Sequence, residues 1–224
     1  RPSRVSSYRY PDKGLASGVP VDLSGPEQVF QFTLRRQVAN VGAVVLTHDP
    51  DVKVSPRLVK ADDENRLVGD PGIPATNNPY AGLPHPYPVV AAILPTPGTY
   101  DLVFDTPTGA KPGRFLFRFW IDDRTPPKIR LLAPTVRVGQ PVRFAVSDRG
   151  SGVDPGSLDV VRDGSHVPFT YAHGIVSVDT TTLAPGPHRV TLTASDYQET
   201  KNNEDVGPVL PNTRVLRANV TVTP

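Results

Sequence analysis

Carboxylates follow two β-type segments in the C-terminal half of the chain. Residues 142–148 and 190–196 each alternate apolar with polar side chains, and they end at Asp148 and Asp196. Such alternation predicts half-buried strands that enter loops at one end of a sandwich. Loops at such an end commonly carry function. Because Ca²⁺ prefers oxygen ligands from loop carboxylates and amides, this pair of loops is a candidate calcium site.

Four further residues with oxygen donors lie nearby in the sequence: two in these loops, and two in the segment at 122–123 that precedes the C-terminal half. In an immunoglobulin-like topology the first strand starts at the same pole as these two loops, so we expect the donors to converge. The candidate ligands are Asp122, Asp123, Asp148, Asp154, Asp196 and Asn202. A second interpretation stays open, because Asp and Asn in turns commonly accept hydrogen bonds from nearby backbone N–H groups.

Catalytic motifs are missing from the chain. It contains no cysteine, which excludes disulfides, thiol nucleophiles and zinc–thiolate sites. None of its five histidines belongs to a metalloprotease helix motif, and there is neither a Gly-x-Ser-x-Gly elbow nor a phosphate-cradling glycine loop. We therefore expect a protein that acts by binding and not by chemistry.

Composition places the chain among folded β-proteins. Of 224 residues, 27 are proline, against a usual share of about 5%, which makes helices scarce. The net charge of +2 does not suggest a nucleic-acid partner, and no apolar stretch approaches the roughly 20 residues that span a bilayer. Because the chain starts at Arg1 and contains no methionine, we expect a processed product or an excised segment.

The pattern of strands and turns predicts an all-β fold of two β-sandwich domains in tandem. A Pro-Pro step at 126–127 follows the end of a strand, so we place the boundary there: residues 1–122 form an N-terminal sandwich with a proline-rich loop at 69–88, and residues 123–224 form an immunoglobulin-like sandwich. The expected strands cover residues 29–34, 41–46, 100–104, 114–121, 129–132, 142–148, 190–196 and 216–222. Asp163-Gly164 and His173-Gly174 predict hairpin turns.

Trp120 is the only tryptophan. In the strand 114–121 it shares a face with Arg114, Leu116 and Arg118, opposite the phenylalanines, so that face is also expected to pack. Trp120 lies two residues from the predicted boundary, which favours a contact between domains. A sugar-stacking or partner surface that combines it with Tyr80 and Tyr87 is the alternative.

Two motifs in the C-terminal half resemble those of bacterial immunoglobulin-like domains of large secreted proteins. They are Asp123-x-Thr125-Pro126-Pro127 and Asp148-x-Gly150-Ser151-Gly152-Val153-Asp154-Pro155. In many such domains the late loop reads Asp-x-x-Gly-Asn, whereas here it is the longer segment 196–204. With Asn78-Pro79-Tyr80, the segments 97–105 and 115–122, and Leu210-Pro211-Asn212-Thr213-Arg214, the whole chain resembles the C-terminal non-catalytic region of secreted subtilisin-like serine peptidases.

The resemblance implies a secreted or cell-surface accessory module that stabilises, positions or attaches an enzyme, whose catalytic domain would belong to the same precursor or to a protein partner. Calcium is an optional cofactor. Two alternatives remain. One is a structural subunit that self-associates into an extracellular fibre or surface layer. The other is a glycan-binding module, which predicts an exposed platform of Trp120, Tyr80 and Tyr87.

Overall fold

The computed structural model describes residues 5–7, 20–22, 27–61, 63–69, 88–105, 113–201 and 212–224. The chain divides into two compact units. Among the described residues, the first unit contains those up to Arg124 together with Arg149–Ser151 and Tyr197–Lys201. The second contains Thr125–Asp148, Gly152–Asp196 and Asn212–Pro224. The predicted domains, 1–122 and 123–224, differ from this division chiefly in the two short segments that the first unit takes from the C-terminal half.

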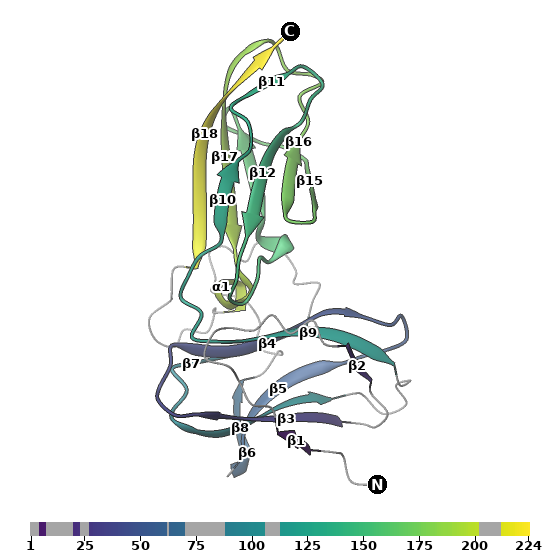
Figure 1. Ribbon diagram of the computed structural model, residues 1–224, viewed down its shortest axis with the longest axis vertical. Helices are drawn as coiled ribbons and strands as arrows, with labels where there is room; N and C mark the ends of the chain where they lie inside the picture. Colours follow the sequence, from purple (N-terminus) through teal and green to yellow (C-terminus); the bar gives the residue numbers. More distant parts are fainter. Residues whose placement is uncertain are drawn as a thin grey trace. The chain divides into compact units, whose positions relative to one another are not determined.

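The first unit consists of two sheets (Figure 1). One sheet has the order β1-β3-β8-β5-β6, and the other has the order β2-β9-β4-β7. Neighbouring strands are antiparallel except for the parallel pair β1 and β3. The strands are β1 (Val5–Ser7), β2 (Pro20–Asp22), β3 (Glu27–Leu34), β4 (Asn40–His48), β5 (Ser55–Lys60), β6 (Asp63–Gly69), β7 (Val89–Ile93), β8 (Gly98–Asp105) and β9 (Arg114–Ile121).

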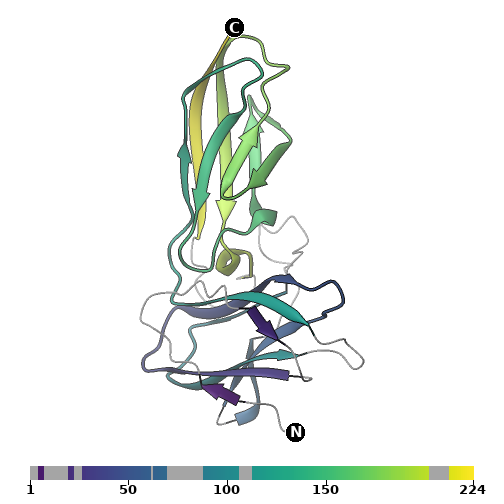
Figure 2. The ribbon, with the colours of Figure 1, turned by 45° about the vertical axis from the view of Figure 1, so that its right-hand side comes forward.

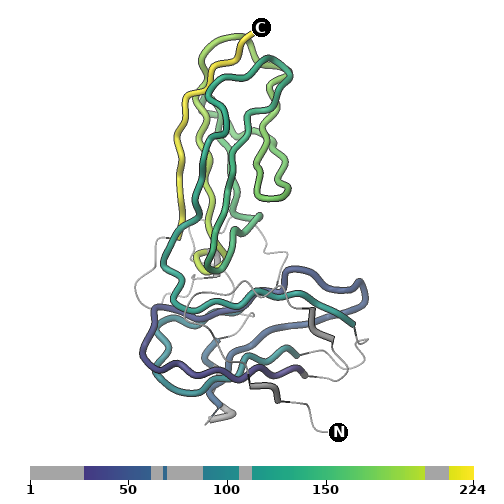
Figure 3. The backbone as a smooth tube through the Cα atoms, viewed as in Figure 1, coloured from purple at the N-terminus to yellow at the C-terminus, as the bar shows by residue number. Residues whose placement is uncertain are grey.

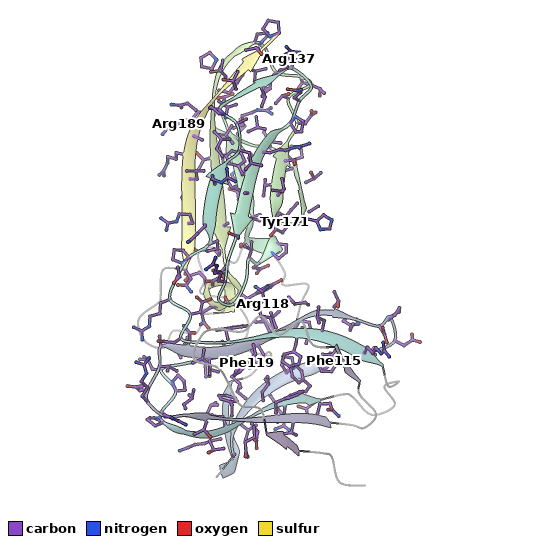
Figure 4. All side chains as sticks on the ribbon, in the orientation of Figure 1. Phe115, Arg118, Phe119, Arg137, Tyr171 and Arg189 are labelled. Carbon is purple, nitrogen blue, oxygen red and sulfur yellow. The ribbon has the colours of Figure 1, made fainter. Side chains whose placement is uncertain are left out.

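Aromatic side chains fill the core of the first unit. The period of two along β9 buries Phe115, Phe117 and Phe119 in this core. They meet rings from the other sheet, as in the edge contact of Phe119 with Phe32 at 5.0 Å between centroids. Figure 4 shows Phe115 and Phe119 on one side of β9 and Arg118 on the other, as the alternation predicts.

The second unit is an immunoglobulin-like sandwich. Its sheets have the orders β10-β12-β16-β15 and β11-β18-β17-β13-β14 (Figures 1 and 2). These orders match the A-B-E-D and G-F-C arrangement of that fold. The strands are β10 (Lys128–Leu131), β11 (Thr135–Arg137), β12 (Val142–Ser147), β13 (Asp159–Arg162), β14 (Ser165–His166), β15 (Phe169–Ala172), β16 (Ile175–Val178), β17 (Gly186–Ser195) and β18 (Thr213–Thr223). A 3₁₀ turn (Pro155–Ser157) precedes β13, and the helix α1 (Tyr197–Lys201), which follows β17 along the chain, belongs to the first unit.

Both predicted hairpin turns are present. Asp163 and Gly164 join β13 to β14 with φ of 50° and 89°, and His173 and Gly174 join β15 to β16 with φ of 50° and 75°. Two consecutive positive φ values are typical of a type I′ turn, which matches the twist of the strands it connects. The tube in Figure 3 follows the chain through the hairpin of β15 and β16.

The prediction of an all-β fold is confirmed, and all eight predicted strands occur, with ends shifted by at most a few residues. The helix α1 was not predicted, because its residues were assigned to a loop. Tyr80, Tyr87 and Asn202 lie outside the described residues, as does nearly all of the proline-rich loop. No helix in the described part of the chain is long and apolar enough to cross a membrane.

Candidate functional site

Trp120 lies on the face of β9 that points away from the aromatic core. This second face is covered, because Trp120 has no exposed surface and forms a small apolar cluster with Val44, Val89, Ala91 and Tyr197. Tyr197 is the first residue of α1, and α1 packs against β7 and β4. A five-residue helix from the loop after β17 therefore completes the first unit.

A chain of buried hydrogen bonds links α1 to the end of β9. The indole Nε1–H of Trp120 donates to Oε1 of Gln198 at 2.7 Å. The backbone N–H of Gln198 donates to the hydroxyl of Ser151 at 3.0 Å, and the N–H of Ser151 donates to Oδ2 of Asp123 at 2.6 Å. Buried polar groups are costly unless they are paired, so these bonds stabilise the closed arrangement.

Asn40, at the start of β4, holds the backbone of Asp123 in place. Its Nδ2 donates to the carbonyl oxygen of Asp123 at 2.6 Å, and its Oδ1 accepts from the N–H of Asp123 at 2.9 Å. Asn40 is completely buried and Asp123 is 6% exposed. We call Asn40, Trp120, Asp123, Ser151 and Gln198 the buried polar network.

Two glycines make room for this network. A Cβ at Gly42, which is paired with Trp120 across β4 and β9, would overlap the indole ring and come within 2.6 Å of the carbonyl oxygen of Val90. A Cβ at Gly150 would overlap the carboxylate of Asp123. Both positions therefore need a residue without a side chain. A glycine inside a valine-rich strand often marks such a close approach, and Gly42 was a signal for this site that the prediction did not use.

Asp122 has a separate structural role. It has a positive φ of 58°, and its Oδ1 accepts hydrogen bonds from the N–H of Ala39 at 2.8 Å and from Nε of Arg124 at 2.9 Å. Burial raises the pKa of Asp122, but these two hydrogen bonds and the positive charges of Arg124 and Arg36 together outweigh that effect and bring the pKa below its ordinary value. The carboxylate is therefore ionised at neutral pH and is held by the backbone and an arginine.

The second unit brings three of the predicted ligands to the ends of β12 and β17. Carboxylate oxygens of Asp148 and Asp196 lie within 4.8 Å of each other, and Asp196 is fully buried. Asp148 accepts from the N–H of Gly152 at 2.7 Å, and Asp154 caps the 3₁₀ turn by accepting from the N–H of Gly156 at 2.8 Å. Turn capping is thus observed for Asp148 and Asp154, while the short distance from Asp148 to Asp196 leaves the metal interpretation a proposal.

Two histidines of the second unit pair with aspartates on hairpins. His166 contacts Asp159 at 2.7 Å, and His188 contacts Asp163 at 2.7 Å while its other ring nitrogen lies 2.9 Å from the carbonyl oxygen of Ala184. Because both acceptors face His188, only the protonated ring can donate to each of them. These contacts give His188 a structural role at the turn.

The exposed aromatic platform of the glycan-binding alternative is contradicted at Trp120. Its ring is buried under α1 and its N–H is bonded to Gln198, so a sugar cannot stack on it in this fold. Tyr80 and Tyr87, the other two platform residues, belong to the part of the chain that is not described. The predicted domain contact at Trp120 stays a prediction, since Gln198 and Tyr197 belong to the same unit as Trp120.

Comparisons with known proteins give no family assignment. No protein-family model matches the chain, and no curated protein matches it. Among solved structures, the chain is similar to the pre-peptidase C-terminal domain of collagenase from Bacillus anthracis at 15% identity, over 53% of this chain and 97% of that one, with a TM-score of 0.35. It is also similar to the adhesin domain of Epf from Streptococcus pyogenes (11% identity, 88% of this chain and 73% of that one, TM-score 0.30) and to fibronectin(III)-like modules of CbhA from Clostridium thermocellum (11%, 91% and 95%, TM-score 0.30). Because the TM-scores of these three structures are below 0.5, the fold rests on the strand pairing described above.

Proposed function

We propose that this chain is a non-catalytic, extracellular accessory module that positions or attaches an associated enzyme. The observation that supports this proposal most strongly is that several polar side chains of the chain have structural roles. Asp123, Ser151 and Gln198 are buried and bonded to one another or to Trp120, and Asp154 caps a turn. Enzymes often use aspartate, serine and glutamine side chains in catalysis, but here these side chains stabilise the fold.

The same construction suits a role outside the cell. A cysteine-free sandwich whose segments are tied together by buried hydrogen bonds keeps its fold without depending on disulfide chemistry. The enzyme that it would serve belongs to the same precursor or binds it as a partner. The resemblance of the sequence to the C-terminal region of subtilisin-like peptidases favours a secreted peptidase.

Two measurements test the accessory role. The first is the protein sequence encoded upstream of Arg1, where a peptidase domain would support the proposal. The second is sedimentation of the purified chain over an about 100-fold range of concentration, because self-assembly depends on concentration. A monomer throughout is expected. Growth into larger species would contradict the accessory role and support the self-assembling subunit.

We also propose a structural calcium ion at Asp148 and Asp196. Their carboxylate oxygens lie within 4.8 Å of each other and Asp196 is fully buried, so a bound cation would reduce the repulsion between them. Ca²⁺ would supply that charge, since it binds carboxylate oxygens and takes six to eight oxygen ligands in all. Calcium should therefore raise the melting temperature, and EDTA should remove the effect.

A further inference from the structure

The outward face of the sheet β10-β12-β16-β15 carries three exposed cations. Alternation directs Ile129, Leu131, Phe144 and Val146 towards the core of the second unit. Lys128, Arg130 and Arg143 therefore point to the opposite side, and all three are exposed. We call these three residues the basic row.

The strand register places the three cations next to one another. Lys128 and Arg130 lie two residues apart on β10, which is about 7 Å along a strand. Arg130 is opposite Ala145 of β12, so Arg143 is its diagonal neighbour, about 7–8 Å away. The step from Lys128 to Arg130 and the step from Arg130 to Arg143 run in the same direction along the strands. The basic row is thus a line of three positive charges with nearly even spacing.

No counter-charge lies within this row. None of the three side chains has a hydrogen bond or an ion pair to another residue in the described part of the chain. Asp179, just beyond the end of β16, is bonded to Thr181, and its backbone carbonyl accepts from Arg162. Neighbouring like charges destabilise a sheet, so an uncompensated row points to an anionic partner.

Hydroxyl groups lie beside the cations on the same face of the sheet. Lys128 is opposite Ser147, and Arg143 is opposite Ser177, which is in turn opposite Thr170. The aromatic side chains of β15, Phe169 and Tyr171, pack against the core instead. Protein partners usually bind through aromatic anchors, whereas cations mixed with hydroxyls match the carboxylates and hydroxyls of an acidic sugar polymer.

We propose that the basic row binds a carboxylate-bearing polysaccharide. This inference goes beyond the accessory role, because it names a surface to which the module would attach. It depends on the second unit alone. Failure of the enzyme partnership would leave it intact, and absence of polymer binding would leave the accessory role intact.

Binding of the full chain to immobilised polygalacturonate, measured at increasing NaCl concentration, tests the proposal. We expect saturable binding that weakens with salt, because exposed charges are screened. Dextran, which is neutral, should not bind. Replacing Arg130 and Arg143 by glutamine should lower the affinity about tenfold, because exposed ion pairs contribute modestly and add up over two sites. Both residues are exposed and their charges repel each other, so the melting temperature should not fall.

A charge-matched variant on the other sheet is the control. Arg189 and Arg217 are exposed on the outward face of β17 and β18, a sheet that also carries Asp159 and Asp163. Their replacement by glutamine removes the same net charge and should leave the affinity within about twofold. Equal losses for the two variants, no binding by the unaltered chain, or binding to polyglutamate but not to polygalacturonate would each overturn the proposal.

Discussion

Nε1 of Trp120 and Oε1 of Gln198 lie 2.7 Å apart, although 78 residues of sequence separate them. This bond joins β9 to α1 inside the first unit. Because the chain has no other tryptophan, the fluorescence of Trp120 reports directly on the packing of α1. The variants below can therefore be followed with one intrinsic probe.

Replacing Gln198 by leucine should destabilise the first unit. The substitution preserves a buried side chain of similar size but leaves the indole N–H without an acceptor, which costs about 1–3 kcal/mol. Nε2 of Gln198 has no hydrogen-bond partner among the described residues, so the removal of this buried group offsets part of the loss. We therefore expect a loss in the free energy of unfolding near the lower end of that range. Urea unfolding followed by Trp120 fluorescence measures it. Gln140→Leu removes only an exposed, long hydrogen bond of 3.4 Å from the N–H of Arg137 and should change stability by less than about 0.5 kcal/mol, so equal effects at both positions would contradict the role of the buried bond.

Replacing Gly42 by alanine should disturb Trp120 itself. The added methyl group overlaps the indole ring and approaches the carbonyl oxygen of Val90, so the ring or the strand must move. Overpacking of this kind costs about 1–3 kcal/mol. We expect a shifted emission maximum and greater quenching by acrylamide. Gly139→Asn is the control, since the space around Gly139 is open and asparagine tolerates its φ of 83°. An unchanged emission spectrum for Gly42→Ala would refute the described packing.

Replacing Asn40 by alanine should have the largest effect. The side chain satisfies both the N–H and the carbonyl oxygen of buried Asp123, and alanine leaves the two groups without these bonds. The expected loss in the free energy of unfolding is at least about 2 kcal/mol, because each buried orphan costs about 1–3 kcal/mol. Asn219→Ala on the exposed side of β18 is the comparison, and its stability should match that of the unaltered chain. A similar stability for Asn40→Ala would argue against the network.

His188 should make stability depend on pH. The hydrogen bond to the carbonyl of Ala184 and then the bond to Asp163 raise the pKa of His188. The bond from His188 and then the N–H of Arg189 lower the pKa of Asp163. A raised histidine pKa stabilises the fold below about pH 6.5, and this contribution is lost as the pH rises through the folded-state value. A lowered aspartate pKa stabilises it above about pH 3.9, and this contribution is lost as the pH falls.

The pair therefore contributes most between about pH 4 and pH 6.5. Melting temperatures of the unaltered chain and of His188→Gln should differ most in that interval and converge above it. His173→Asn, on the exposed hairpin of β15 and β16, is the control and should follow the unaltered chain, because asparagine tolerates the positive φ of this position. A constant difference across the whole pH range would show that the contribution of His188 is not ionic.

Calcium should stabilise the second unit through Asp148 and Asp196. A ligand that binds only the folded state raises the free energy of unfolding and therefore the melting temperature. At a ligand concentration of 100 times the dissociation constant, the gain in the free energy of unfolding is about 2.7 kcal/mol. Asp196→Asn should remove most of the increase, whereas Asp159→Asn, at the first residue of β13 where the carboxylate contacts His166, should preserve it. An equal shift with Mg²⁺, or no shift with Ca²⁺, would exclude the site.

The strands were predictable where alternation and turn chemistry agree. Phe115, Phe117 and Phe119 recur at every second position of β9, and Asp163-Gly164 fixes the register of its hairpin by local backbone preference. Both signals are local, because the residues that form each of them lie within a few positions of one another in the sequence. Strands β5 and β7 were not predicted, because β5 contains a proline and β7 is a short, continuously buried segment that lacks alternation.

The buried polar network was not predicted, because its partners lie far apart in sequence. Asn40 and Asp123 are separated by 83 residues, and nothing in the composition of either segment indicates the other. The convergence of Asp148 and Asp196 was predictable, since both follow strands that end at the same pole. Their neighbour Asp154 serves a local turn, which is the use that short polar side chains commonly have after a strand.

The helix α1 also determines when the first unit can finish folding. During synthesis the strands β3 to β9 are made first, but Trp120 stays uncovered until Tyr197 and Gln198 have been added. Domains usually fold as units from the N-terminus, and long-range contacts are the slowest to form. Here the two halves of the chain cannot fold strictly in turn, and a fragment that stops at residue 124 would expose an indole ring and the carboxylate of Asp123.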